Sequence, residues 1–401
     1  MNKKNFLEGI MVGIILAMSV NILASFAIPA LSQSASSSSP AKSELVTNDK
    51  LSKIYKIIDT NFVGEYSGEV LEDSMYWGLV AGLDDVYSSY MSAEEFTVFN
   101  EQTEGQYAGI GAVVTATEDE RVMVVSPYDG SPAANAGIMP KDIIMEVNGM
   151  DTRGAGLDTV VSMMKGEPGT SVNITLYRES EKRTFDVTIV RDTITIQTIT
   201  HKMLDNNIGY IRLSGFERVT YKQFVTALNS LQADGAEGFI LDVRNNPGGL
   251  LDVVADICNL LVPKGNIVYT EDKNGEQQFM RSDNKYLNMP MALLVNGNSA
   301  SASEVMAGAI KDHEVGVLIG EQTFGKGVVQ NIFPLEDGSA VKVTIARFYS
   351  PNGVCIHGEG ITPDYIVEMD EKLSANISTI EYEEDIQLQK AVEVVSEMIA
   401  Q

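Results

Sequence analysis

Histidine and basic residues are scarce in this chain. Only three histidines are present, His201, His313 and His357, and there is no H-E-x-x-H motif or cluster of cysteine and histidine, so the sequence predicts no metal site. Lysine and arginine number 29 against 55 aspartate and glutamate residues, which gives a formal net charge of −26. A chain this acidic repels a phosphate backbone, and this argues against a nucleic-acid-binding protein.

Cysteine is almost absent as well. The two cysteines, Cys258 and Cys355, lie far apart in sequence and in no metal-like spacing. Each is in an apolar or glycine-rich segment, which favours two buried thiols over a disulfide. A single disulfide would also be compatible with an exported protein.

The N-terminus carries an uncharged, largely apolar run from residue 9 to residue 30, preceded by Lys3 and Lys4. Positive residues before an apolar run are typical of export signals, and 22 residues are long enough to cross a bilayer as a helix. We therefore expect residues 1–31 to be a signal peptide or a transmembrane anchor. Residues 32–44 are a Ser-rich linker. The rest of the chain is then extracytoplasmic, either as a single-pass protein of the cell membrane or, if the signal is cleaved, as a secreted protein.

Four blocks follow the linker. Residues 45–104 show apolar residues at helical spacing and predict a small helical cap. Residues 105–192 contain several short strands and two helices, which is typical of one compact module. In residues 193–372, strands alternate with helices, so a layered α/β domain is expected. Residues 373–401 end in an amphipathic helix that would pack on the helical cap or on a second protomer.

Three polar, glycine- or serine-rich segments follow buried strands in the largest block. They are Arg244-Asn-Asn-Pro-Gly-Gly249, Ser299-Ala-Ser-Ala-Ser-Glu304 and Thr323-Phe-Gly-Lys-Gly-Val-Val-Gln330. All three come just after the carboxyl ends of predicted strands, where α/β folds usually place their sites.

The residue types in these segments favour nucleophilic catalysis. Ser301 opens a predicted helix, whose positive end stabilises developing negative charge, but a serine hydroxyl needs a base. Lys326 lies between two glycines, and burial would lower its pKa so that the neutral amine accepts the serine proton. Backbone N–H groups near Gly248, Gly249 and Ala302 would form an oxyanion hole.

Each segment also has an ordinary structural explanation. Serines commonly cap helices, Gly-Lys-Gly is frequently a solvated turn, and Asn-Pro-Gly-Gly is a natural turn sequence. The joint occurrence of all three on one α/β block favours the catalytic interpretation. A histidine-based triad is an alternative, but His313 has no matching aspartate motif. The spacing around Lys326 does not fit a phosphate-binding loop.

At these residues the sequence resembles the carboxyl-terminal processing peptidases, also called tail-specific proteases. The resemblance covers roughly residues 50–370 and extends to Ala346-Arg-Phe-Tyr-Ser-Pro-Asn-Gly353 and Gly360-Ile-Thr-Pro-Asp364. It implies that Ser301 is the nucleophile, that Lys326 is the general base and that Gln330 helps to hold the lysine. It places the oxyanion region at Gly248 or Gly249 and Ala302. The implied fold is multi-domain α/β, with a crotonase-like protease core and an inserted PDZ domain.

The block at residues 105–192 resembles the PDZ module of this family. Tyr107-Ala-Gly-Ile-Gly111 is similar to the loop that receives a peptide carboxylate, so Gly109, Ile110 and Gly111 are the expected peptide-binding residues. Ser131–Gly137 and Asp142–Gly149 are similar to the rest of the signature. One departure is Lys141, which stands where the family usually has glycine and bears on the conformation of a turn.

The resemblance implies a serine endopeptidase that uses a Ser–Lys pair and selects exported proteins by their apolar C-terminal tails. It implies no cofactor, and helical amphipathicity together with family analogy suggests a homodimer. Two alternatives remain at this point. One is a non-enzymatic PDZ scaffold on an inactive protease core, and the other is a small-molecule-binding protein or a different crotonase-like enzyme. An export signal and a PDZ module argue against acyl-CoA chemistry.

Overall fold

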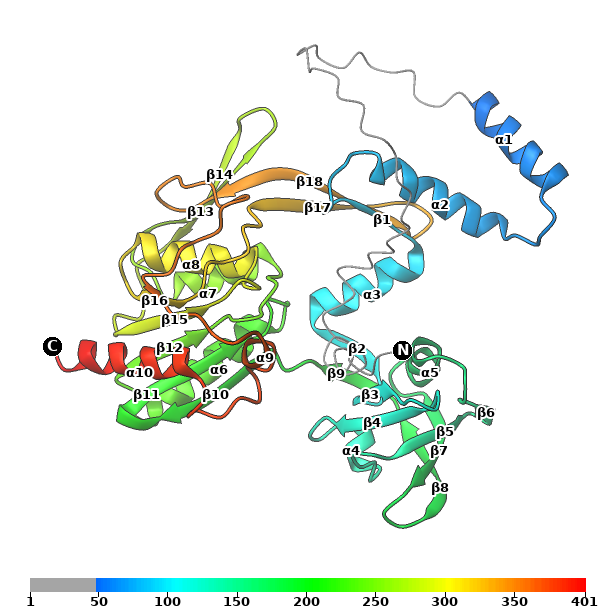
Figure 1. Ribbon diagram of the computed structural model, residues 1–401, viewed down its shortest axis with the longest axis horizontal. Helices are drawn as coiled ribbons and strands as arrows, with labels where there is room; N and C mark the ends of the chain where they lie inside the picture. Colours follow the sequence, from blue (N-terminus) through cyan, green and yellow to red (C-terminus); the bar gives the residue numbers. More distant parts are fainter. Residues whose placement is uncertain (1–47) are drawn as a thin grey trace.

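A computed structural model describes residues 48–401, so the predicted export signal and linker at residues 1–44 lie outside the described residues. No helix within residues 48–401 is long and apolar enough to span a membrane. Figure 1 shows three parts, which are an N-terminal segment of helices, a small domain rich in strands and a larger α/β domain.

The N-terminal segment, residues 48–104, is mainly helical. Its elements are α1 (Asn48–Asn61), α2 (Gly68–Ala81), β1 (Ser89–Met91) and α3 (Ala93–Glu104). A capping box begins α3, because Ser92 and Glu95 bind each other's backbone amides, and Gly105 ends it in the left-handed conformation. Strand β1 was not expected within this block, and it pairs with a strand of the larger domain.

The small domain is a curved sheet with two short helices. Its sheet has the order β3-β4-β5-β7-β8, with β6 paired to β5. A separate ribbon of β2 and β9 joins it to the rest of the chain. The elements are β2 (Gln106–Gly109), β3 (Ala112–Ala116), β4 (Val122–Pro127), α4 (Pro132–Asn135), β5 (Ile143–Val147), β6 (Met150–Asp151), α5 (Leu157–Met164), β7 (Ser171–Arg178), β8 (Arg183–Val190) and β9 (Asp192–Thr195).

A buried ion pair closes this small domain. The guanidinium of Arg178 donates to both carboxylate oxygens of Asp142, at 2.8 and 2.7 Å, and to the carbonyl of Gly137 at 2.7 Å. Asp142 thus ties the start of β5 to the end of β7. The preceding residue, Lys141, has a φ of 72°, so the position that the resemblance marked for glycine is left-handed here.

The larger domain is built on a six-stranded sheet of order β10-β11-β12-β15-β16-β19, in which all neighbours except β10 and β11 are parallel. The strands are β10 (Ile199–Leu204), β11 (Ile208–Leu213), β12 (Gly238–Asp242), β15 (Met291–Val295), β16 (Val317–Gly320) and β19 (Tyr365–Ile366). The helices between them are α6 (Thr220–Ala233), α7 (Leu251–Asn259) and α8 (Ala302–Asp312), with a 3₁₀ turn at Asp205–Asn207.

The two faces of this sheet bury different cores. On β12, Phe239 and Leu241 point to the cluster formed by α6, α7 and α8, whereas Ile240 points to the opposite side. This alternation follows from the two-residue period of a strand. The helices α7 and α8 also pack against β13 and β14 of a second sheet, so they form the layer between the two sheets (Figure 1).

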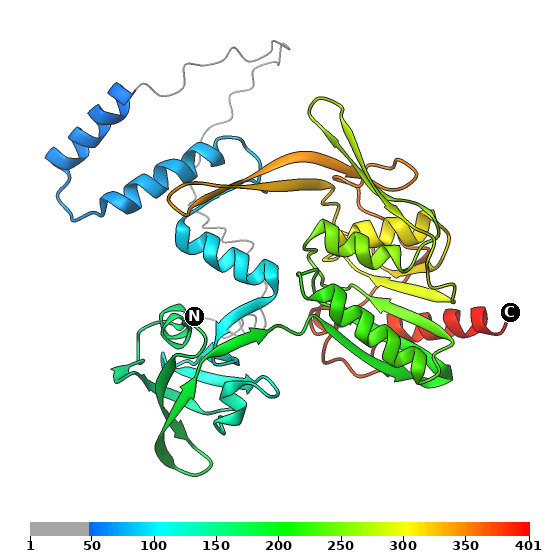
Figure 2. The ribbon, with the colours of Figure 1, turned by 180° about the vertical axis from the view of Figure 1, so that it is seen from behind.

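The second sheet has the order β1-β18-β13-β14, and β17 pairs with β18. Its strands besides β1 are β13 (Gly265–Asp272), β14 (Gln277–Ser282), β17 (Val328–Pro334) and β18 (Ala340–Tyr349). Strands β17 and β18, which we call the arm, run from the larger domain to the N-terminal segment (Figures 1 and 2). The arm ends where β1 pairs with β18, at Ser89 opposite Lys342.

The chain ends in α9 (Glu371–Ala375) and α10 (Ile386–Ile399). Helix α10 buries Leu388, Ala391, Val394 and Val395 against the face of the six-stranded sheet formed by β12, β15 and β16. The amphipathic helix was expected to pack on the helical cap or on a second protomer, and the expectation of packing on the cap is wrong, because its apolar face covers the sheet of its own domain. The face of the six-stranded sheet opposite helices α6, α7 and α8 is apolar, and α10 of the same domain covers it.

The cysteines are both free thiols. Cys258 is buried in α7, whereas Cys355 is only half-buried. The expectation of free thiols is therefore confirmed, and that of burial holds for Cys258 alone.

Candidate active site

The three segments singled out in the sequence meet at one edge of the six-stranded sheet. They follow β12, β15 and β16, which are neighbouring parallel strands, so their carboxyl ends share that edge. The backbone also joins them directly, because Ala300 N donates to Asn246 O at 3.1 Å and Phe324 N donates to Ser299 O at 3.1 Å.

Ser301 occupies an unusual backbone conformation immediately before α8. Its φ and ψ are 56° and −113°, outside the regions that non-glycine residues normally adopt. Its amide N donates to Oε2 of Glu304 at 2.9 Å. A strained residue persists only where its surroundings hold it, and such residues cluster at functional sites. Here the helix start and the carboxylate provide that support.

Glu304 connects the serine to the lysine segment. Its side chain is fully buried in α8, and each of its two carboxylate oxygens accepts two hydrogen bonds. Oε2 accepts from the amides of Ser301 at 2.9 Å and Lys326 at 2.8 Å. Oε1 accepts from Thr323 Oγ1 and from Gly325 N, both at 2.7 Å. One buried carboxylate therefore fixes the backbone of both predicted catalytic residues around a single oxygen atom.

Glu304 lies at the end of the Ser299–Glu304 motif, but no role for it was predicted from the sequence. A signal was present, because Ser-x-x-Glu is the spacing of a capping box, and this predicts the bond to the Ser301 amide. The bonds to Gly325 and Lys326 had no such signal, since they depend on how two distant segments fold together.

The environment of Lys326 disfavours its charged form. Burial lowers the pKa of Lys326, and the nearby positive charge of Lys342 lowers it further, while Asp85 and Glu304 oppose the shift. The ammonium nitrogen lies 4.9 Å from the centre of the Tyr87 ring. The lysine is thus poised to lose its proton below the pH at which an ordinary lysine does.

Two of the predicted oxyanion residues, Gly248 and Ala302, lie beside Ser301, whereas Gly249 lies against the backbone of Phe216. A side chain cannot fit at Gly248, because a Cβ atom there would lie 2.9 Å from Cβ of Ser301 and 3.0 Å from the amide nitrogen of Ala302. The amide of Gly248 donates to Asn246 Oδ1 at 2.9 Å. Within residues 48–401, the amides of Gly249 and Ala302 donate no hydrogen bond. Both amides are therefore unpaired in the part of the chain that the structure describes.

Gln330 follows Lys326 in the sequence and lies on β17. Its Nε2 donates to Thr344 Oγ1 on β18 at 3.2 Å. The structure records no hydrogen bond between Gln330 and Lys326 in the part of the chain that it describes. It places Gln330 in the arm and Lys326 in the turn before it.

His313, the alternative base, lies at the other end of α8. Ser301 precedes the helix and His313 follows it, so the 11-residue helix separates them by roughly 16 Å. The ring nitrogen Nε2 of His313 binds the carbonyl of Asn266 at 2.7 Å. A Ser301–His313 pair is therefore excluded by distance.

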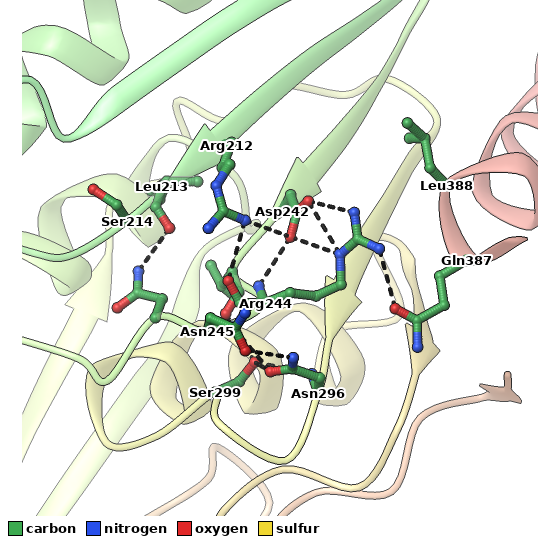
Figure 3. Close-up of polar contacts among 12 residues, drawn as sticks. Arg212, Leu213, Ser214, Asp242, Arg244, Asn245, Asn296, Ser299, Gln387 and Leu388 are labelled. Carbon is green, nitrogen blue, oxygen red and sulfur yellow. Dashed lines mark hydrogen bonds and ion pairs between the residues drawn. The ribbon is translucent and has the colours of Figure 1, made fainter. Parts of the chain in front are cut away.

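A buried polar network supports the first of the three segments (Figure 3). Arg244 is fully buried and binds Asp242 at 2.7 Å, Asp385 at 2.8 Å and Gln387 at 3.1 Å. Burial alone would raise the pKa of Asp242, but Arg244 and Arg212 outweigh it and lower that pKa. Because Asp385 and Gln387 begin α10, the C-terminal helix is bonded to the segment that carries Gly248 and Gly249.

Asparagines extend this network to the serine segment. Asn245 N donates to Asn296 Oδ1 at 2.9 Å, and Asn296 Nδ2 donates back to Asn245 Oδ1 at 2.8 Å (Figure 3). Asn245 Nδ2 also binds the carbonyl of Ser374 at 2.7 Å, and Ser299 Oγ binds that of Val243 at 2.8 Å. The loops after β12 and β15 thus form one bonded unit.

Of the predicted peptide-binding residues, Gly109 ends β2, where it pairs with Asp192, and Ile110 and Gly111 form the turn between β2 and β3. The carbonyls of Ile110 and Gly111 accept hydrogen bonds from Ala133 N at 2.8 Å and Tyr128 N at 2.9 Å. The amides of Ile110 and Gly111 have no acceptor among residues 48–401. Strand β3 is an edge of its sheet, and α5 packs against it. An unpaired strand edge beside free amides is suited to an added peptide strand with a terminal carboxylate.

Among the described residues, no group of histidine, cysteine, aspartate and glutamate side chains could hold a metal ion.

Comparison with known proteins identifies the family. Residues 207–367 match Peptidase family S41, and residues 108–189 match the PDZ domain. The chain is 40% identical over 323 residues to the carboxy-terminal processing protease CtpA of Bacillus subtilis (strain 168), covering 80% of this chain and 69% of that protein. It is 37% identical over 340 residues to a probable CtpA-like serine protease of Staphylococcus aureus (strain bovine RF122 / ET3-1), covering 84% and 68%.

Among solved structures, the photosystem II D1 C-terminal processing protease aligns with a TM-score of 0.47 and 27% identity, over 89% of this chain and 98% of that chain. The sequence relatives align over most of their own length as well as over most of this chain. The chain therefore belongs to Peptidase family S41, as a carboxy-terminal processing serine protease that carries a PDZ domain.

Proposed function

We propose that this peptidase uses Ser301 as nucleophile and Lys326 as general base to cut exported proteins chosen by their C-terminal tails. The observation that carries the proposal is the buried carboxylate of Glu304, which binds the amides of both residues. A carboxylate that only capped the helix would bind the amide of Ser301 and would not also need to bind the amide of Lys326. The crotonase-like class of core and the helical-cap role of the N-terminal segment belong to the same proposal.

Peptide-bond cleavage then proceeds in two halves. The Ser301 hydroxyl oxygen attacks the carbonyl carbon while its proton passes to the neutral amine of Lys326. The resulting ammonium gives that proton to the leaving amine as the peptide C–N bond breaks. In the second half, Lys326 takes a proton from water, which hydrolyses the ester on Ser301 and restores the hydroxyl. Every proton that Lys326 takes up is returned, so no cofactor is needed.

The oxyanion formed in each half needs hydrogen-bond donors. The free amides of Gly249 and Ala302 are the proposed donors, and Ala302 adds the positive end of the α8 dipole. Removing one such donor from a serine protease typically costs about 2.7–4 kcal/mol of transition-state stabilisation. Gly248 leaves room beside Ser301 because it has no side chain. Its own amide is bound to Asn246, so Gly248 is not proposed as a donor.

The lowered pKa of Lys326 gives this mechanism a pH signature. The base works only as the neutral amine, so activity is expected to rise with pH through an ionisation below that of a free lysine. Activity that stayed flat between about pH 6 and pH 10 would contradict a lysine base.

The deciding experiment is cleavage of an unfolded protein with an apolar C-terminus, by the unmutated chain beside Ser301→Ala and Lys326→Ala. Matched controls are Ser230→Ala and Lys264→Ala, which remove the same side chains at exposed positions. We expect both site variants to lose cleavage and both controls to keep it. Cleavage by Ser301→Ala would overturn the assignment. Tail binding without cleavage in the unmutated chain would favour the alternative of a PDZ scaffold.

Two further proposals concern assembly and location. The N-terminal segment exposes large apolar side chains on α1, on α2 and between them, among them Ile57, Phe62, Val70 and Trp77, and a homodimer would cover them. Light scattering that finds a monomer at working concentration would remove the dimer. We also propose an extracytoplasmic location, through the apolar run at residues 9–30, which cell fractionation would test.

A further inference from the structure

The ring of Tyr87 lies against the proposed general base, although Tyr87 is outside residues 207–367. The Nζ atom of Lys326 is 4.9 Å from the centre of that ring, and the ring of His357 meets it edge-on at 6.5 Å. Tyr87, Val328 and His357 line a cavity of about 490 Å³ at the start of the arm. Tyr87 thus forms part of the surroundings of the amine.

The turn that carries Tyr87 is bonded to the arm. Ser88 Oγ donates to Asp85 Oδ2 at 2.5 Å and accepts from Thr344 N of β18 at 3.0 Å, while Tyr87 N donates to Asp85 Oδ1 at 3.2 Å. The next residue, Ser89, pairs with Lys342. The position of the ring is therefore set by the same arm that begins directly after Lys326.

Four charged or titratable groups act on the lysine or contact the ring, namely Glu304 from α8, Asp85 from the turn, Lys342 from β18 and His357 from the segment after β18. Glu271, Asp272 and Lys273, from the end of β13 and the turn after it, and Arg347 of β18 line the same cavity. The two carboxylates favour a positive charge on Lys326, and Lys342 opposes it. The face of an aromatic ring attracts an ammonium group but not a neutral amine.

We propose that Tyr87 is a positioning residue that holds Nζ of Lys326 and stabilises the ammonium that forms as Ser301 gives up its proton. The inference rests on the proposed Ser301–Lys326 mechanism. In that step the proton leaves Oγ of Ser301 and binds Nζ as the bond from Oγ to the substrate carbon forms. An interaction that strengthens only as charge appears acts on kcat, whereas substrate binding is left unchanged.

The test is the pH dependence of kcat and KM for the full chain, measured with one peptide substrate. Tyr87→Leu keeps an apolar side chain that excludes water but removes the ring. We expect kcat to fall about three- to tenfold, KM to stay within about twofold, and the apparent pKa of the kcat profile to fall by about half to one unit. Tyr87→Phe keeps the ring face, so its profile is expected to keep the original pKa.

Tyr66→Leu is the matched control, because Tyr66 is an exposed tyrosine in the same N-terminal segment. If Tyr87→Leu does not fold, Tyr87→Met replaces it as the ring-free variant. A pKa that stays or rises without the ring, or the same shift in Tyr87→Phe or Tyr66→Leu, overturns the role of Tyr87. Full activity in Lys326→Ala overturns the lysine mechanism and this inference together. An inactive Lys326→Ala beside an unshifted Tyr87→Leu overturns the inference alone.

Discussion

Glu304 shows how much a single buried residue organises in this site. A buried carboxylate is costly unless its oxygens are fully hydrogen-bonded. Here three backbone amides and one hydroxyl satisfy it, and it lies in the first turn of α8, where the helix dipole favours negative charge. Amides and a hydroxyl thus compensate its charge without a cation, although Glu304 still favours the charged form of Lys326 and the lowered pKa of that lysine comes from burial and Lys342.

We predict that Glu304→Gln lowers kcat about 100-fold, because an amide nitrogen in place of one oxygen would face amide donors and displace the lysine turn. The same change is expected to reduce the free energy of unfolding by about 1–3 kcal/mol. Peptide cleavage and urea unfolding measure the two effects. The control is Glu336→Gln, at an exposed position in the turn of the arm. Wild-type kcat in Glu304→Gln would refute the linking role.

Some residues of the site could be predicted from a local sequence pattern and others could not. The positions of Ser301 and Lys326 could be predicted because each lies in a local motif after a buried strand. Tyr87 had no such signal, since it approaches Lys326 across 239 positions of the chain, counted from residue 87 to residue 326. Local patterns do not encode contacts of that separation.

At the scale of elements, α10 is the part whose role the sequence did not reveal. Its amphipathic pattern predicted a helix, but not which apolar surface it covers. The structure packs it on the six-stranded sheet and bonds its first turn to Arg244. Arg244 and Asp385 are 141 positions apart, and both are fully or almost fully buried. Helix α10 is thereby linked to the segment beside Ser301.

We predict that Asp385→Asn reduces the free energy of unfolding by about 3–5 kcal/mol, because it leaves the buried Arg244 with one carboxylate instead of two. The matched control is Glu393→Gln, which breaks an exposed pair with Lys390 on the same helix. That change is expected to cost less than about 0.5 kcal/mol. Urea unfolding of both variants gives the comparison, and equal losses would contradict the argument from burial.

For the turn before β5 we predict a gain in the free energy of unfolding instead of a loss. Lys141 adopts a φ of 72°, which costs a non-glycine residue roughly 1–2 kcal/mol. Lys141→Gly removes that strain but gives the unfolded chain more freedom, so a net gain of about 1 kcal/mol is expected. Hydrogen exchange at the amides of β5 and β7 would report it. Faster exchange in the variant would show that the lysine is not strained.

At the scale of the whole molecule, the sequence predicted the parts better than their assembly. Strands β11, β12, β15 and β16 and helices α6, α7 and α8 follow the expected alternation of strands with helices, because hydrophobic runs and turn residues define them locally. The hairpin of β13 and β14, the arm, and the pairing of β1 with β18 were not expected. Each depends on register between segments whose edges are irregular, as at the bulge between Val329 and Gln330.

The proposed binding of substrate tails and the proposed cleavage would take place in separate domains, so mutations should separate them. Gly111 and Gly130 both have positive φ, of 76° and 71°. A Cβ at Gly111 would lie 2.5 Å from Cβ of Ser131, whereas a Cβ at Gly130 would meet nothing within 4 Å. Gly111→Ala must therefore shift the turn whose free amides are proposed to bind the tail carboxylate. Gly130→Ala carries the same backbone strain without the collision.

We predict that Gly111→Ala weakens binding of a peptide with a free, apolar C-terminus at least about tenfold, while Gly130→Ala binds as the unmutated chain does. An amidated peptide should bind all three chains equally weakly, because it lacks the carboxylate. Calorimetry measures binding in the Ser301→Ala background, where the peptide is not cut. Gly111→Ala with Ser301 intact should lose its preference for tailed proteins but still cleave a short peptide. Loss of both activities would mean that the turn also supports the catalytic domain.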